Sequence, residues 1–117
     1  MPRAASKLRD RVKFQRRVLT ADGFGNREGD WADLEIERAC ELIPTRGGET
    51  IQAARLTGST LWDCWVRRDR DTITITTGDR AVDVRDPSRV FNVRFNEDMD
   101  GRNAWRLIQL ESGVADG

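Results

Sequence analysis

Hydrophobic and polar residues alternate along most of this chain with a period of two, which is typical of β-strands that bury one face. The pattern predicts a first strand at about residues 11–18, whose apolar side holds Val12, Phe14 and Val18. A dense turn signal follows at residues 22–26. The next strand ends at Pro44, and its apolar parity, interrupted only by Arg38, consists of Leu34, Ile36, Cys40 and Leu42. Together the two segments predict a long hairpin.

Further segments with strand-like alternation or short apolar runs lie at residues 59–68, 72–76, 81–84, 91–95 and 105–110. Six or seven short strands at regular spacing, separated by turn residues, indicate an all-β barrel or sandwich. The residues expected to face its core are Val12, Phe14, Ile36, Cys40, Leu42, Ile73, Ile75, Phe91, Val93 and Phe95.

The alternation breaks between the second and third predicted strands, over residues 45–58. Gly47 and Gly48 lie near the start of this segment. The residues after them fit a helix of about two turns, with Gly58 as its stop signal. Connections of this length in a small β domain are usually functional or mobile. We therefore expect one domain over residues 1–117, with a long loop and short helix at 45–58 and a flexible tail at 112–117.

Composition removes several classes of function. The chain has 117 residues, the size of one domain, and contains no histidine, which excludes Ser-His and Cys-His nucleophile pairs and His-ligated metals. Cys40 and Cys64 are too few for a zinc cage and are interpreted as buried thiols. No apolar run approaches the roughly 20 residues of a membrane span. With no catalytic constellation in view, the sequence predicts no enzymatic activity and no cofactor.

Charge is balanced overall, with 20 basic and 20 acidic residues, but it is unevenly distributed. Residues 1–17 are strongly basic, whereas residues 22–41 are strongly acidic. A neutral total argues against a dedicated nucleic-acid module, which is normally basic. The two segments could pair with each other across one hairpin, or they could be complementary patches that meet on different copies of the chain.

Aromatic residues on the predicted strands offer an alternative function. Trp62, Trp65, Phe91 and Phe95 could stack bases in the manner of an OB-like module that binds single-stranded nucleic acid. Aromatic residues at strand parity more often belong to a core, which is the interpretation that we favour.

Six short motifs, in order, resemble those of tailed-phage head–tail joining proteins, the head-closure or stopper subunits and the adaptor subunits. The first is LRDRVKFQR at residues 8–16, and the second is DGFG followed by WADL at residues 22–34. The remaining four are LIP with GGE at residues 42–49, ITTGDR at residues 75–80, VFNV at residues 90–93, and WRLI at residues 105–108. The tryptophan-rich segment at residues 62–65 departs from the family, whose third strand is usually polar.

The resemblance implies a β-barrel subunit of a ring that lies below the portal in the neck of a phage, prophage or gene transfer agent particle. Such a ring closes the DNA-filled head and docks the tail. Its partners would be copies of itself, a portal or adaptor protein above, and a tail-terminator or tail protein below. Double-stranded DNA would pass through without sequence-specific binding. The protein would reside in the virion neck, and in the host cytoplasm before assembly, with no membrane, metal or cofactor.

Two sets of candidate site residues follow. The loop residues expected to gate the channel or dock a neighbouring ring are Pro44, Arg46, Gly47, Gly48, Glu49, Gln52 and Arg55. The residues expected at the interface between subunits are Arg9, Arg11, Arg16, Arg17, Glu35, Glu37 and Glu41. A closed ring of identical subunits needs two different complementary patches on each chain, and the basic and acidic segments are the candidates.

Overall fold

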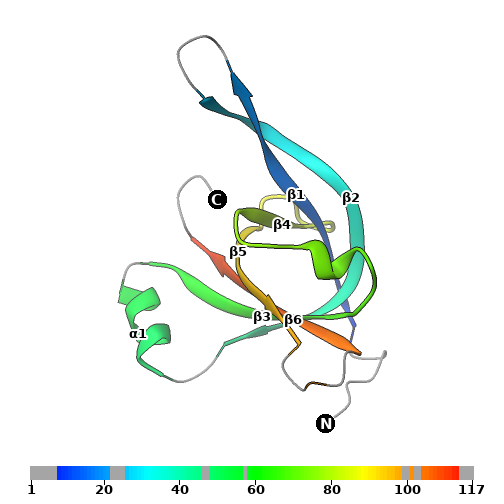
Figure 1. Ribbon diagram of the computed structural model, residues 1–117. Coiled ribbons are helices and arrows are strands. Elements are labelled where there is room, and N and C mark those ends of the chain that lie inside the picture. The colour runs from blue at the N-terminus through cyan, green and yellow to red at the C-terminus, as the bar shows by residue number, and fades with distance from the viewer. Residues whose placement is uncertain are drawn as a thin grey trace.

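The computed structural model describes residues 8–21, 26–45, 48–56, 58–98, 101 and 104–113. Within these residues, six antiparallel strands form one closed barrel in the order β1-β2-β3-β6-β5-β4, as Figure 1 shows. The strands are β1 (Asp10–Ala21), β2 (Asn26–Pro44), β3 (Thr60–Arg67), β4 (Asp79–Asp83), β5 (Val90–Glu97) and β6 (Trp105–Ser112). The all-β prediction is confirmed. Ser112, expected in a flexible tail, is the last residue of β6.

The barrel interior is filled by side chains from all six strands and from the segment that follows β3. Seven of the ten residues predicted to face the core are buried: Val12, Phe14, Ile36, Cys40, Ile75, Phe91 and Val93. Leu42 is partly buried and packs against this cluster. Most of the residues predicted from the alternation are therefore placed correctly, because inward and outward positions alternate along every strand of a barrel.

The segment 72–76 is not a strand, and the placement of Ile73 in the core was wrong. Thr72–Thr74 form a short 3-10 helix, η2, and Ile73 is 41% exposed. The Asp69 carboxylate accepts hydrogen bonds from the backbone amides of Asp71 and Thr72. These side-chain bonds satisfy the backbone locally, so they compete with strand pairing. The tight turn buries Thr72 and Ile75 and turns Ile73 to solvent.

Phe95 is only half-buried, in contrast to its predicted position in the core. The β5–β6 register shifts between Val93, opposite Leu110, and Phe95, opposite Gln109. An extra residue in one strand of a pair reverses the facing of the residues beyond it. The alternation after Val93 therefore no longer points Phe95 into the interior.

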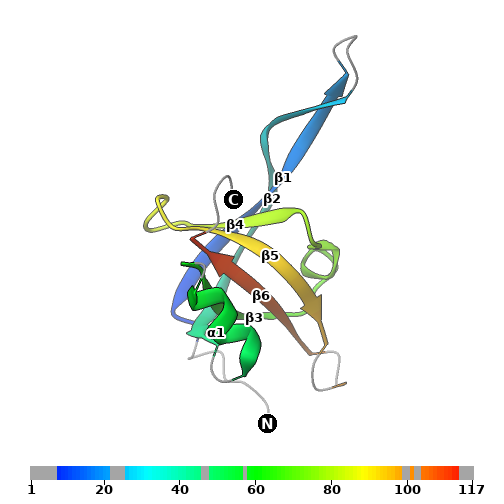
Figure 2. The same cartoon turned by 90° about the vertical axis from the view of Figure 1, so that its left-hand side faces the viewer.

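The β1–β2 hairpin extends well beyond the barrel, as Figures 1 and 2 show. The two strands remain paired as far as Ala21 and Asn26, and the molecule measures 52 × 35 × 28 Å along its principal axes. Most of the predicted turn, residues 22–25, lies outside the described residues. Val18 shares the parity of the core residues, yet it is 43% exposed because it lies in the projecting part of the hairpin.

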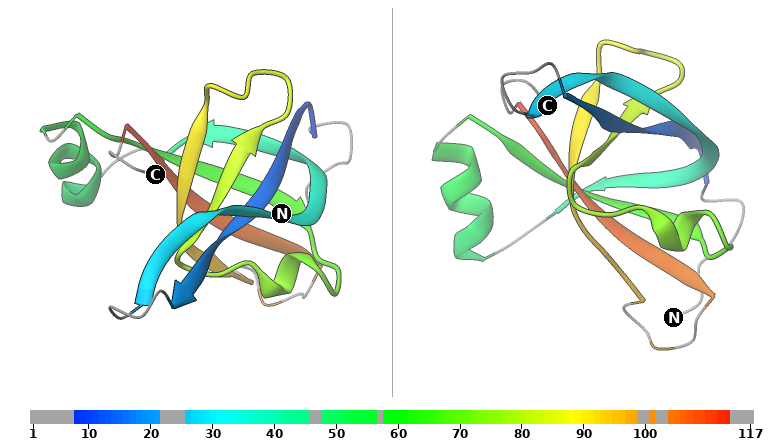
Figure 3. Two further views of the ribbon diagram at one scale, coloured as in Figure 1. Left: turned by 90° about the horizontal axis from the view of Figure 1, so that it is seen from above. Right: turned by 45° about the horizontal axis from the view of Figure 1, so that its top comes forward.

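Helix α1 (Glu49–Leu56) occupies the connection between β2 and β3, which confirms the predicted insertion. Figure 3 shows that α1 stands beside the barrel, on the side away from η2. Ile51 and Leu61 form a small apolar cluster of their own, separate from the barrel core. No helix within the described residues is long and apolar enough to cross a membrane.

Candidate functional site

The basic face of β1 lies beside the acidic face of β2, because the two strands pair in antiparallel register. The Arg11 guanidinium donates a hydrogen bond to the Glu37 carboxylate, and both side chains are nearly half exposed. Lys13 Nζ lies 4.0 Å from Asp33 Oδ2. Part of the charge split seen in the sequence is thus neutralised within one hairpin. Exposed pairs of this kind contribute little stability, about 0–1 kcal/mol each.

Arg16 lies beside a buried carboxylate of the same chain. Its Nε and Nη2 donate to Asp79 Oδ1 and Oδ2 at 2.7 and 3.0 Å, and the Asp79 side chain is 1% exposed. Asp79 also accepts the Thr76 amide at 3.0 Å. The hydrogen bond to Asp79 raises the pKa of the Arg16 guanidinium. Sequence reasoning missed this pair, since the partners are 63 positions apart and meet only because β4 pairs with β1.

Two arginines enclose Trp31 at the base of the projecting hairpin. The Arg17 and Arg80 guanidinium carbons lie 4.6 and 4.4 Å from the centre of the Trp31 ring. Arg80 also donates a hydrogen bond to the Gln15 side chain at 2.7 Å. Because Arg17 is on β1 and Arg80 on β4, the cation–π contacts connect the hairpin to the barrel wall.

A strained bulge marks the point where β2 leaves the barrel. Phe14 pairs with Ile36, but Gln15 pairs with Asp33, so β2 carries two extra residues at this point. Glu35, one of them, has a φ of 60°, a conformation that residues other than glycine rarely adopt. The Glu35 amide donates to Asp33 Oδ1 at 2.7 Å. The Glu35 side chain is exposed and therefore points to solvent at the bend of the strand.

The other predicted interface residues lie at the opposite end of the hairpin. Glu41 is half-buried and lines a small hollow together with Arg9, Asp10, Leu42 and Ile43. The backbone carbonyl of Arg9 accepts a hydrogen bond from Arg85 at 2.6 Å. All seven predicted interface residues therefore lie on or next to the β1–β2 hairpin.

The predicted loop residues that the structure describes lie in helix α1 or in the chain that leads to it from β2. Pro44, Gly48, Gln52 and Arg55 are exposed. Arg46 and Gly47 lie outside the described residues, and Glu49 begins the helix. A shallow hollow on the helix is lined by Gln52, Arg55 and Leu56. Leu56 is 89% exposed, so the helix presents an apolar side chain to solvent.

Arg38 interrupts the apolar parity of β2 because it binds two carboxylates. It donates to Asp69 and Asp71, each at 2.9 Å. Burial alone would raise the pKa of Asp69, but the hydrogen bonds from Arg38 and from the Thr72 and Asp71 amides outweigh it and lower the pKa to about 2. The cluster fixes the loop after β3 against β2.

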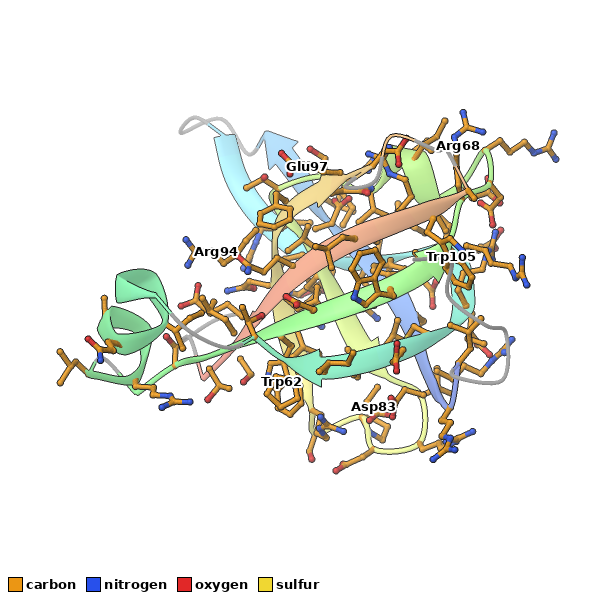
Figure 4. All side chains as sticks on the ribbon, turned by 90° about the horizontal axis from the view of Figure 1, so that it is seen from below. Trp62, Arg68, Asp83, Arg94, Glu97 and Trp105 are labelled. Carbon is orange, nitrogen blue, oxygen red and sulfur yellow. The ribbon has the colours of Figure 1, made fainter. Side chains whose placement is uncertain are left out.

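The aromatic residues proposed for base stacking mostly serve the core. Phe91 is 1% exposed, and Trp62 packs edge-on against it with ring centres 6.1 Å apart. Arg89 lies over both rings and binds Asp83, and Figure 4 shows Trp62 and Asp83 on the same side of the barrel. This packing favours the core interpretation over a stacking surface. No cluster of three or more potential metal ligands occurs among the described residues.

Comparisons with known proteins found a matching family and a similar fold. The family model described as "Phage head completion protein" matches residues 3–113. A chain of a solved structure titled "Virion of native gene transfer agent (GTA) particle" has a similar fold, with a TM-score of 0.61 at 20% sequence identity. The similarity covers 90% of this chain and 94% of that one. No curated protein matches the sequence.

Proposed function

This chain belongs to the phage head completion protein family, a family of structural virion proteins, and we propose that it forms a ring in the neck of a tailed phage or phage-like particle. The ring closes the DNA-filled head and docks the tail. The observation that carries the proposal is the family match over residues 3–113, nearly the whole chain. The likeness in fold to a chain of a gene transfer agent virion supports it.

The ring has four kinds of contact in this proposal. Copies of the chain meet side by side, a portal or adaptor protein lies above, and a tail-terminator or tail protein lies below. Double-stranded DNA passes through without sequence-specific binding. A chain with a net charge of zero suits such a role, because its main partners are proteins.

Within the ring, α1 and its flanking residues are the proposed gating or docking element. The helix is joined to the barrel through the small Ile51–Leu61 cluster, and an eight-residue helix has little stability of its own. Exposed Gln52, Arg55 and Leu56 give it a polar and an apolar surface for a neighbouring protein. The barrel provides the rigid frame that carries this element.

The test uses particles that lack the protein or carry a shortened loop. Particles without the protein are expected to fill with DNA and then leak it, or to fail to join tails, as seen by electron microscopy and by nuclease sensitivity of the packaged DNA. Replacing residues 46–57 by a short glycine-serine linker should leave the barrel folded but produce the same defect. Particles that retain DNA and carry tails without this protein would refute the proposed function.

A further inference from the structure

Among the described residues, neither edge of the β1–β2 hairpin has a strand partner where the hairpin leaves the barrel. β4 pairs with β1 only as far as Arg16, and β3 pairs with β2 only from Glu41 to Pro44. In the part of the chain that the structure describes, residues 17–21 of β1 therefore pair only with residues 26–31 of β2, and β2 has no second strand partner before Glu41. The projecting hairpin is a two-stranded ribbon with two open edges.

Such a ribbon needs a partner, on general grounds. A two-stranded ribbon is at best marginally stable in water, and an open strand edge is a template for pairing with another chain. The Trp31 contacts with Arg17 and Arg80 hold the base of the ribbon. The Glu35 bulge fixes its direction, and Val18 exposes apolar surface on it. These features position the ribbon away from its own barrel, where another molecule can reach it.

The charges on the two edges select the partner. Along its open edge, β2 carries Glu28, Asp30, Asp33, Glu35 and Glu37, whereas the open segment of β1, residues 17–21, carries one charge, Arg17. Like charges directly opposite each other destabilise a strand pair, which disfavours β2 against β2. The open segment of β1 has no acidic residue, so it can lie beside the β2 edge of another copy without this repulsion, and Arg17 adds a positive charge there. The complementary surface for this ribbon is therefore a second copy of the same chain.

We propose that neighbouring subunits add their hairpins edge to edge, with β2 of one copy along β1 of the next, so that a continuous sheet runs between subunits. In a ring with cyclic symmetry, every β1 runs in one direction and every β2 in the other. The new pairs are therefore antiparallel, like those within the hairpin. The contact uses two different edges, which is what a closed ring of identical chains requires. This inference rests on the proposed ring.

The test is disulfide trapping between two single-cysteine additions in separate molecules. Val18→Cys marks the β1 edge and Asp30→Cys marks the β2 edge, and both positions are exposed. The native thiols of Cys40 and Cys64 are buried, with no exposed surface, so they do not compete. The two variants are mixed at high concentration under mild oxidation, and disulfide-linked dimers are resolved by mass. Keeping the cysteines in different molecules excludes a disulfide across one hairpin.

We expect the V18C–D30C heterodimer to form at least about tenfold faster than a collision control, because pairing raises the effective concentration of the two thiols. The control mixes D30C with Ser88→Cys, an exposed site on the β4–β5 connection. Heterodimer formation at the control rate, or a predominance of V18C homodimers, would overturn the proposal. Either result would leave the neck function standing, since that is tested separately by DNA leakage and tail joining.

Discussion

Replacing Arg16 should destabilise the protein more than replacing Arg11, although both arginines lie on the basic strand β1. Replacing Arg16 with alanine leaves the buried Asp79 without its cationic partner. We expect a loss of about 2 kcal/mol in the free energy of unfolding, because an unpaired buried charge is costly. Replacing Arg11 breaks only the exposed pair with Glu37 and should cost less than about 1 kcal/mol. Urea unfolding of both variants measures the difference.

The double variant Arg16→Ala with Asp79→Asn provides the control for this prediction. With the carboxylate removed, much of the lost stability should return. Equal effects of the Arg16 and Arg11 substitutions would contradict the assignment of Asp79 as a buried partner. Arg16 is thus a poorer probe of subunit contacts than the sequence suggested, because changing it also weakens the barrel.

Asp69 should make the stability of the protein sensitive to acid. Its pKa in the folded protein is about 2, below the ordinary value of 3.8, so the carboxylate favours folding while it is ionised. This contribution is complete above about pH 4, the unfolded pKa, and is lost as the pH falls through about 2. Unfolding measured between pH 4 and pH 2 should therefore show a shallower pH dependence in Asp69→Asn than in the wild type. Parallel curves would show that Asp69 does not carry this linkage.

At the scale of elements, the bulge in β2 connects the barrel to the projecting ribbon. Asp33→Ala removes the acceptor of the Glu35 amide, and a lost hydrogen bond of this kind should cost about 1 kcal/mol. The bend should also loosen, which we expect as faster hydrogen exchange of the Glu35 amide. Asp30→Ala is the matched control, because Asp30 is an exposed carboxylate on the same strand. Unchanged exchange in Asp33→Ala would contradict the role of Asp33 in holding the bend.

The molecule as a whole is expected to assemble only weakly by itself. Each exposed ion pair contributes little, and the hairpin edge is short, so a stable ring should need the preassembled head as a template. Sedimentation should show a monomer, or a weak association that decreases as salt is added. Thermal unfolding of the monomer should change less with salt. A tight ring whose size is independent of protein concentration would contradict this expectation.

The sequence predicted some of these features correctly and others not. Alternation identified the strands and seven core residues, since burial of one face imposes a period of two on each strand. It failed at Phe95 and Ile73, where a register shift and a local turn changed the facing. Neither leaves a signal in hydrophobicity, because both depend on how the backbone satisfies its hydrogen bonds.

The sequence by itself thus determined the all-β class, the inserted helix, the family resemblance and the division of charge between the first two strands. Only the tertiary structure decided which charges are neutralised within the chain and which remain at an open edge. Arg16 finds Asp79 only because the barrel closes between β1 and β4. Within the described residues, the ribbon edges are open because β4 pairs only with the barrel end of β1, and β3 pairs only with the barrel end of β2. Strand pairing between residues far apart in sequence fixes these outcomes, and local pattern contains no record of it.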